Sequence, residues 1–118
     1  MLDQQGYKTM LVTTTFDFSG YEIIDYKGVV RGLIVRSPTI SQGILGGLKQ
    51  FIGGKIGAYT EMCEQTRDQA YQEIVKHAQG MGANAIVGFR YDATEIGATG
   101  AATEVLCYGT AVVVRKLV

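Results

Sequence analysis

Few residues of this sequence could ligate a metal ion, and they are widely spaced. They are Cys63, His77, Cys107 and four methionines, with no CxxC or HxxxH motif. Soft metals need such side chains around one point, about 2.0–2.3 Å from the ion. Cys63 and His77 share one face of a predicted helix, but about 21 Å of helix axis separates them. We therefore predict no metal site within one chain, although copies of His77 or Met81 could meet in a symmetric assembly.

A glycine-rich segment before the longest predicted helix is a candidate anion site. It reads Gly53-Gly54-Lys55-Ile56-Gly57. Backbone amides at a helix N-terminus bind anions, and Lys55 adds a positive charge. The segment lacks both the Walker pattern and the GxGxxG fingerprint. Glycines that end one helix and begin another explain it without a ligand, and we prefer that interpretation while keeping Lys55 as a ligand-binding candidate.

Arg67 is the charged residue nearest the apolar face of the same helix, about 40° from the centre of its apolar stripe. A guanidinium in that place needs carboxylate or carbonyl partners. Asp92 and Glu104 on predicted strands are candidates. We prefer an ion pair that holds the helix to the sheet, or one subunit to the next. The alternative is a composite enzyme site between subunits, built from residues such as Tyr59, Arg67 and Asp92.

No arrangement of residues predicts catalysis. His77 is the single histidine, and it lies at the edge of the helix's apolar face. No serine stands in a nucleophile-elbow motif. Asp92 and Glu95 point to opposite faces of one strand, so they are not a paired acid and base. We assign no catalytic residue and no particular cofactor, and we favour a binding protein over an enzyme.

The overall charge excludes some partners. Eleven basic residues balance eleven acidic ones. A chain with no net charge has no long-range attraction for phosphates, so we expect neither nucleic acid nor a membrane as a partner. The sequence has no signal-peptide pattern at its start and no apolar run of the roughly 20 residues that span a bilayer. We therefore expect a cytoplasmic protein with reduced cysteines.

Hydrophobic periodicity predicts one α+β domain over residues 1–118, with residues 1–7 as a flexible N-terminus. The predicted strands are Lys8–Phe16, Glu22–Arg36, Asn84–Glu95 and Thr103–Arg115. A weak, glycine-rich helix, with apolar residues from Ile44 to Ile52, and a long helix over Gly57–Gln79 lie between the second and third strands. The order β-β-α-α-β-β predicts a two-layer sandwich, in which the long helix covers one face of a mostly antiparallel sheet of about four strands.

Alternation along the strands predicts which residues face the helix. In the second strand they are Ile24, Tyr26, Val30 and Ile34, and the same side holds Gly28 and Gly32. Two inward glycines four residues apart indicate a closely packed helix or a β-bulge. In the third strand one face carries Ala85, Val87, Phe89, Tyr91 and Ala93. The run Ala111-Val112-Val113-Val114 predicts a strand that is buried on both faces.

The other face of the sheet retains many apolar residues. These are Val29, Leu33, Leu106, Tyr108, Val112 and Val114. A single helix layer covers one face only, and small monomers rarely expose so much apolar surface. Association with further copies of the chain would bury it, and closed symmetric assemblies are the common form. We therefore predict a homo-oligomer. The alternative is a different register, in which these residues point inward.

Several strings, in order and spacing, resemble the YbjQ family of uncharacterised bacterial and archaeal proteins. They are Leu11-Val12-Thr13-Thr14-Thr15, Ile24-Asp25-Tyr26-Lys27-Gly28-Val29-Val30-Arg31-Gly32, Gly53-Gly54-Lys55-Ile56-Gly57-Ala58-Tyr59, Gly82-Ala83-Asn84-Ala85-Ile86-Val87-Gly88 and Gly109-Thr110-Ala111-Val112. The resemblance covers residues 10 to 115 and implies a homopentameric ring. The family is described as heavy-metal-binding, and no catalytic residues can be carried over. Thr60 departs from the family pattern, in which glutamate usually follows Gly-Ala-Tyr.

These expectations lead to three hypotheses about function. The first is a non-enzymatic homopentamer that binds a small ligand or ion where its subunits meet. The alternatives are a heavy-metal-binding protein and an enzyme with a composite site between subunits. The ligand-binding candidates are Lys55, Tyr59, Arg67 and Asp92.

Overall fold

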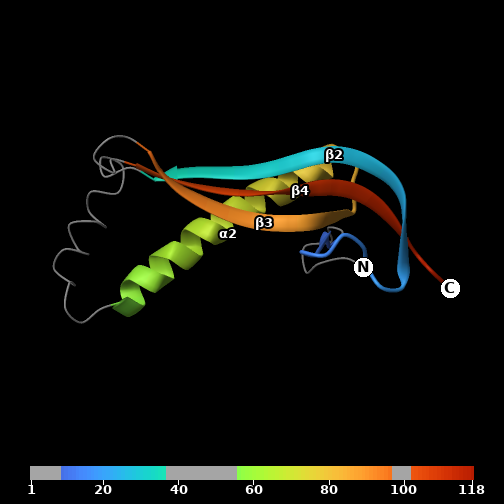
Figure 1. Ribbon diagram of the computed structural model, residues 1–118, viewed down its shortest axis with the longest axis horizontal. Coiled ribbons are helices and arrows are strands. Elements are labelled where there is room, and N and C mark those ends of the chain that lie inside the picture. The colour runs from blue at the N-terminus through green and yellow to red at the C-terminus, as the bar shows by residue number, and fades with distance from the viewer. Residues whose placement is uncertain (1–8, 37–55, 97–101) are drawn as a thin grey trace.

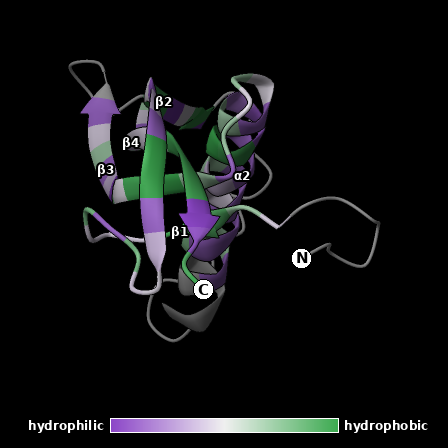
Figure 2. Cartoon of the chain, turned by 90° about the vertical axis from the view of Figure 1, so that its right-hand side faces the viewer, coloured by the Kyte–Doolittle hydropathy of each residue, from purple (hydrophilic) through white to green (hydrophobic). Residues whose placement is uncertain are grey.

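The computed structural model describes residues 9–36, 56–96 and 102–118. They form a four-stranded sheet in the order β1-β3-β4-β2 and one long helix on one of its faces (Figures 1 and 2). The elements are β1 (Leu11–Val12), β2 (Tyr21–Arg36), α2 (Ile56–Gly80), β3 (Ala85–Ile96) and β4 (Ala102–Lys116). The α+β class and the three long strands are confirmed, as is the long helix. The predicted helix around Ile44–Ile52 and the N-terminus 1–7 lie outside the described residues.

The sheet is mixed, which corrects the prediction of a mostly antiparallel sheet. β3 and β4 pair antiparallel, as do β4 and β2, but β1 pairs parallel with β3. The reason is that the first two strands do not form a hairpin: they lie at opposite edges of the sheet. The predicted strand Lys8–Phe16 is reduced to β1, although residues 13 and 15 still exchange backbone hydrogen bonds with residues 86, 88 and 89.

Glycines at three positions determine how the strands pack. Gly32 lies beneath α2, where an added methyl group would come within 2.7 Å of the Ile74 nitrogen. Gly28, with φ of 125°, lies at a register shift in β2. Gly88, with φ of 65°, lies at a register shift in β3. Left-handed backbone of this kind favours glycine. The predicted close helix and the predicted bulge in β2 are therefore both present, at different glycines.

Because of the bulges, some residues predicted to face the helix do not face it. In β2 the register shifts leave Val30 buried beneath α2, but Ile24 and Tyr26 are 52% and 69% exposed instead of facing the helix. In β3 the shift separates Val87, which packs on the other face, from Phe89, which packs under the helix. A bulge places two residues opposite one, so the strict alternation assumed from the sequence changes face there.

Two hydrophobic clusters lie on the two faces of the sheet. The helix-side cluster includes Val30, Ala70, Ile74, Ala78, Ile86, Phe89, Val105, Cys107 and Ala111. The outer cluster consists of Ala85, Val87, Val112 and Val114, covered by Leu11, Phe18, Tyr21 and Ile23. Burial of Ala111, Val112 and Val114 confirms that the end of β4 is apolar on both faces. Within the described ranges, no helix combines the length and apolar character needed to cross a membrane.

Candidate functional site

Arg67 lies beside an aromatic cluster between α2 and β3. Its guanidinium carbon is 5.9 Å from the centre of the Tyr91 ring, and the Tyr91 hydroxyl is 3.5 Å from the Arg67 carbonyl oxygen. Tyr91 packs edge-to-face on Phe89, which packs in the same way on Tyr71. A cation within about 6 Å of a ring is attracted to its face. Arg67 therefore helps to join the helix to the sheet through an aromatic ring, and the ion pairs among the described residues do not include it.

The structure does not bring Arg67 and Asp92 together. Tyr91 contacts α2, and successive side chains of a strand point to opposite faces. Asp92 consequently lies on the outer face, where its Oδ1 accepts a local hydrogen bond from the Ala93 N–H at 2.9 Å. Glu104 pairs in register with Thr94, two residues along from Asp92, and shares that outer face. The two proposed partners of Arg67 thus face away from it.

The other two candidates are only partly placed. Tyr59 belongs to α2 by its backbone, and its side chain lies outside the described part of the chain. Lys55 and the Gly53–Gly57 loop before the helix likewise fall outside it, apart from the helical backbone of Ile56 and Gly57. The anion-site hypothesis for Lys55 stays a prediction.

Three side chains on the helix side of the sheet, those of Cys107, Tyr71 and Tyr91, have raised pKa values. Burial raises the pKa of the Cys107 thiol, and its Sγ donates a hydrogen bond to the Ala70 carbonyl at 3.1 Å. Burial also raises the pKa of Tyr71, reinforced by the nearby Asp68 carboxylate, and that of Tyr91, reinforced by Cys107. These groups are held in their protonated forms near neutral pH. They are consequently poor nucleophiles, bases or thiolate ligands.

His77 is engaged with the edge of the sheet. Its Nδ1 accepts a hydrogen bond of 3.2 Å from the Arg31 N–H, on the edge of β2 that faces away from β4. A neutral imidazole has one acceptor nitrogen, so His77 cannot keep this bond and also ligate a metal through Nε2. Cys63 and Cys107 are both free thiols, and Cys107 contacts Ala70, two helical turns beyond Cys63. No group of three His, Cys, Asp or Glu residues in the described ranges could hold a metal ion.

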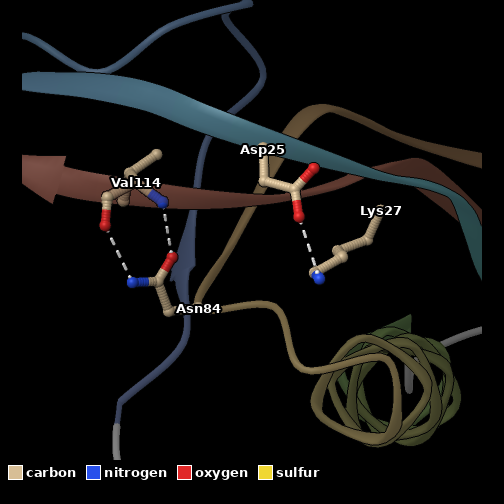
Figure 3. Close-up of polar contacts among 4 residues, drawn as sticks. All are labelled: Asp25, Lys27, Asn84 and Val114. Carbon is tan, nitrogen blue, oxygen red and sulfur yellow. Dashed lines mark hydrogen bonds and ion pairs between the residues drawn. The ribbon is translucent and has the colours of Figure 1, made fainter.

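Asn84 has a structural role that its residue type and position did not predict. Its side-chain Oδ1 accepts a bond of 2.8 Å from the Val114 N–H, and its Nδ2 donates one of 2.9 Å to the Val114 carbonyl (Figure 3). Its main chain bonds Val112 and Leu11. Asn84 thereby joins the end of α2 to β4 and to β1. Figure 3 also shows the ion pair of 2.9 Å between Asp25 and Lys27 on β2. The only signal for Asn84 in the sequence was its place in a string shared with the YbjQ family.

The outer face beyond the covered cluster carries a set of exposed apolar side chains, which we call the outer patch. It comprises Val29 (74% exposed), Leu33 (46%), Val35 (48%), Tyr108 (41%) and the half-buried Leu106. The register places Leu33 opposite Leu106 and Val35 opposite Glu104. The predicted exposure of Val29, Leu33 and Tyr108 is confirmed. Val112 and Val114, expected to be exposed as well, are instead covered by residues 11–23.

Comparison with known proteins places the chain in a family. The model of YbjQ proteins, described as "Putative heavy-metal-binding", matches residues 10–115. The chain belongs to the YbjQ family. A UPF0145 protein of Legionella pneumophila is 58% identical over 106 residues, which are 90% of this chain and 99% of that protein. A UPF0145 protein of Francisella philomiragia is 57% identical over 106 residues, with 90% and 100% covered.

The likeness to a solved structure concerns the fold. A crystal structure of a protein of unknown function from Pediococcus pentosaceus, described as a member of the DUF74 family, superposes with a TM-score of 0.59. The two chains are 23% identical, and the match covers 90% of this chain and 98% of the other. The α+β arrangement is therefore shared with a protein of distant sequence. The names of the Legionella and Francisella proteins state no activity.

Proposed function

We propose that this YbjQ-family protein is a non-enzymatic, self-associating module, a homopentamer that holds a small ligand or ion where its subunits meet. The observation that carries the proposal is the outer patch on the sheet. Four of its five side chains are at least 41% exposed in the single chain. Adjacent apolar side chains on one flat face are typical of protein–protein contacts.

The polar groups of the described chain also favour a binding protein. Asn84, His77 and Cys107 are each engaged in hydrogen bonds that join one element to another. The Arg90 guanidinium donates to the Thr14 and Phe89 carbonyl oxygens at 2.9 and 2.8 Å. These side chains serve the fold. A site that binds a further molecule is therefore best built from groups of more than one subunit.

Binding of a heavy metal is the second candidate, and the family description favours it. The geometry restricts how this chain could do so. The Cys107 thiol is buried and donates a hydrogen bond to the Ala70 carbonyl, and the Nδ1 of His77 accepts a hydrogen bond from the Arg31 N–H. Soft metals need deprotonated thiols and free imidazole nitrogens. A metal site would then have to lie between subunits, with ligands such as the half-buried Cys63.

Native mass spectrometry of freshly purified protein tests these proposals together. We expect the mass of five chains plus an additional mass, which would identify the class of ligand or metal. Five bare chains would support the assembly and contradict a ligand that is retained on purification. A single-chain mass would contradict self-association. Adding zinc, copper and cadmium ions in turn, one equivalent per chain, tests the metal candidate, because each bound ion adds a known mass.

A further inference from the structure

The outer patch has positive charges toward one end and negative charges toward the other. Arg31 of β2 and Arg90 of β3 both lie in register with Tyr108 of β4 and form a positive margin. The Arg90 guanidinium donates to the Thr14 and Phe89 carbonyl oxygens of its own chain. Asp92 lies on β3, in register with Leu106, and Glu104 lies on β4 beside Val35. Of the ion pairs formed among the described residues, none involves Arg31, Asp92 or Glu104. A positive margin and a negative margin thus flank an apolar centre.

We infer that the outer patch is the contact surface between copies of this chain, with Arg31 of one copy bound to Asp92 and Glu104 of the next. The inference rests on the proposed self-association and adds to it a surface and a set of ion pairs. In a head-to-tail ring every subunit would use its positive margin once and its negative margin once. Closed rings require such a repeated, non-identical contact.

Charge complementarity favours a second copy over other occupants. A second copy supplies both signs, because each chain carries Arg31 as well as Asp92 and Glu104. Nucleic acid or anionic lipid would be attracted by Arg31 and Arg90 but repelled by the two carboxylates. The whole chain has no net charge, so copies do not repel one another at long range.

The apolar centre provides the affinity, and the charges provide the orientation. Leu33 and Leu106 lie opposite each other between the two margins, and Leu33 is 46% exposed. Central apolar and aromatic side chains carry most of the binding energy of an interface, while charges at its rim select the partner and its register. We therefore expect Leu33 to contribute more than Arg31.

Residues 11–23 of the same chain limit how far the outer patch extends. Residues 11–23 cover the outer face over Val112 and Val114. At their border the Arg90 guanidinium, through Nη1, holds the Thr14 carbonyl at 2.9 Å. The outer patch begins beyond these residues, with Val29 opposite Thr110 and then Tyr108 opposite both Arg90 and Arg31. One part of the apolar face is thus covered within the chain, and the remainder is left for a second copy.

The first test replaces the centre of the patch. Leu33→Glu is compared with Leu117→Glu, which changes a leucine of similar exposure (52%) beyond the end of β4. Sedimentation velocity over a dilution series measures association, and circular dichroism verifies folding. We expect Leu33→Glu to raise the dissociation constant about 30-fold or more, as for a central interface residue, and Leu117→Glu to leave it unchanged.

The second test reverses the charges and remains informative if Leu33→Glu does not fold. Arg31→Glu is expected to weaken association about tenfold, with the greatest effect at low salt. A chain that carries Arg31→Glu, Asp92→Arg and Glu104→Arg together should regain association, because every contact is then reversed in sign. Lys76→Glu on the exposed side of α2 is the matched control, with a side chain 72% exposed.

Three results would overturn the inference. If the wild-type protein assembles and all these variants assemble equally well, the contact lies elsewhere, and self-association itself still stands. If the wild-type protein is a monomer, self-association and the inference both fail. If Leu33→Glu lowers the unfolding temperature strongly without changing the assembly, residues of the same chain cover the patch.

Discussion

The two ends of the sheet's outer face have the same apolar chemistry but different surroundings. At one end Ala85, Val87, Val112 and Val114 lie beneath Leu11, Phe18, Tyr21 and Ile23 and are at most 6% exposed. At the other end the outer patch has no such cover, and Val29 is 74% exposed. The difference shows that apolar residues on a strand do not by themselves reveal whether they serve folding or association. The position of residues 11–23 separates the two roles.

The largest expected effect comes from placing an aspartate at the covered end of the outer face, compared with an aspartate in the outer patch. Val112→Asp would bury a carboxylate at a position with no exposure, so we expect a loss of about 4 kcal/mol or more in the free energy of unfolding, or no folding at all. Leu33→Asp, at a 46% exposed position, should cost less than about 1 kcal/mol. Urea unfolding of both variants at a concentration too low for assembly gives the comparison. Equal losses would show that the outer patch belongs to the core.

A smaller effect on stability is expected at Gly32, which faces α2 from β2, the strand that also carries Leu33. Gly32→Ala would place a methyl group 2.7 Å from the Ile74 nitrogen, so α2 must shift. We expect a loss of about 2–3 kcal/mol in the free energy of unfolding, as for other overpacked sites. Gly80→Ala at the end of α2 is the control, because a methyl group there meets no atom within 4 Å. A neutral Gly32→Ala, measured by thermal unfolding, would contradict the close contact of helix and strand.

A substitution of Asn84 tests whether its side chain stabilises the covered end of the outer face. Asn84→Ala removes both side-chain hydrogen bonds to Val114, and we expect a loss of about 2 kcal/mol at about 1 kcal/mol for each bond. Hydrogen exchange should rise at the amides of residues 11 and 114, which bond to the Asn84 carbonyl and to its Oδ1. Thr13→Val, which removes an exposed bond to Thr15, should change stability by less than about 0.5 kcal/mol. Unchanged exchange at both amides would refute the role of Asn84.

The smallest expected effect is a dependence on alkaline pH. Burial raises the pKa of the Cys107 thiol above its ordinary value of 9.0, so the unfolded chain releases this proton at a lower pH than the folded chain. The contribution of Cys107 to stability is complete below pH 9.0 and is lost as the pH rises through the folded pKa. Cys107→Ala should flatten the fall in stability over that range, whereas Cys63→Ala should not. Identical slopes in both variants would contradict this.

Much of the fold could be predicted because its signals are local. Helical periodicity predicted a helix over Gly57–Gln79, and α2 spans Ile56–Gly80. The inward pair Gly28 and Gly32 predicted a bulge or a close helix, and both occur. The prediction that Ile24 and Tyr26 face the helix was wrong. The bulges that turn them outward depend on the pairing of β2 with β4.

The candidate residues were harder to predict than the fold. The sequence placed Arg67 near the apolar face of the helix, but it could not tell which face of β3 the helix covers. Since α2 lies on the side of Tyr91, Arg67 contacts this ring and Asp92 faces away. The contact of the Cys107 thiol with the Ala70 carbonyl joins residues 37 positions apart, and no pattern in the sequence indicated it.

By itself the sequence determined the order of the elements, the span of the long helix and an excess of apolar residues over what one helix layer can cover. These properties follow from residue periodicity and composition, which act over a few neighbours along the chain. Only the tertiary structure decided that β1 pairs parallel with β3, where the bulges turn the strands, and which end of the outer face residues 11–23 cover. Those choices depend on contacts between segments that are distant in the sequence, and their energies are settled only when all the strands pair together.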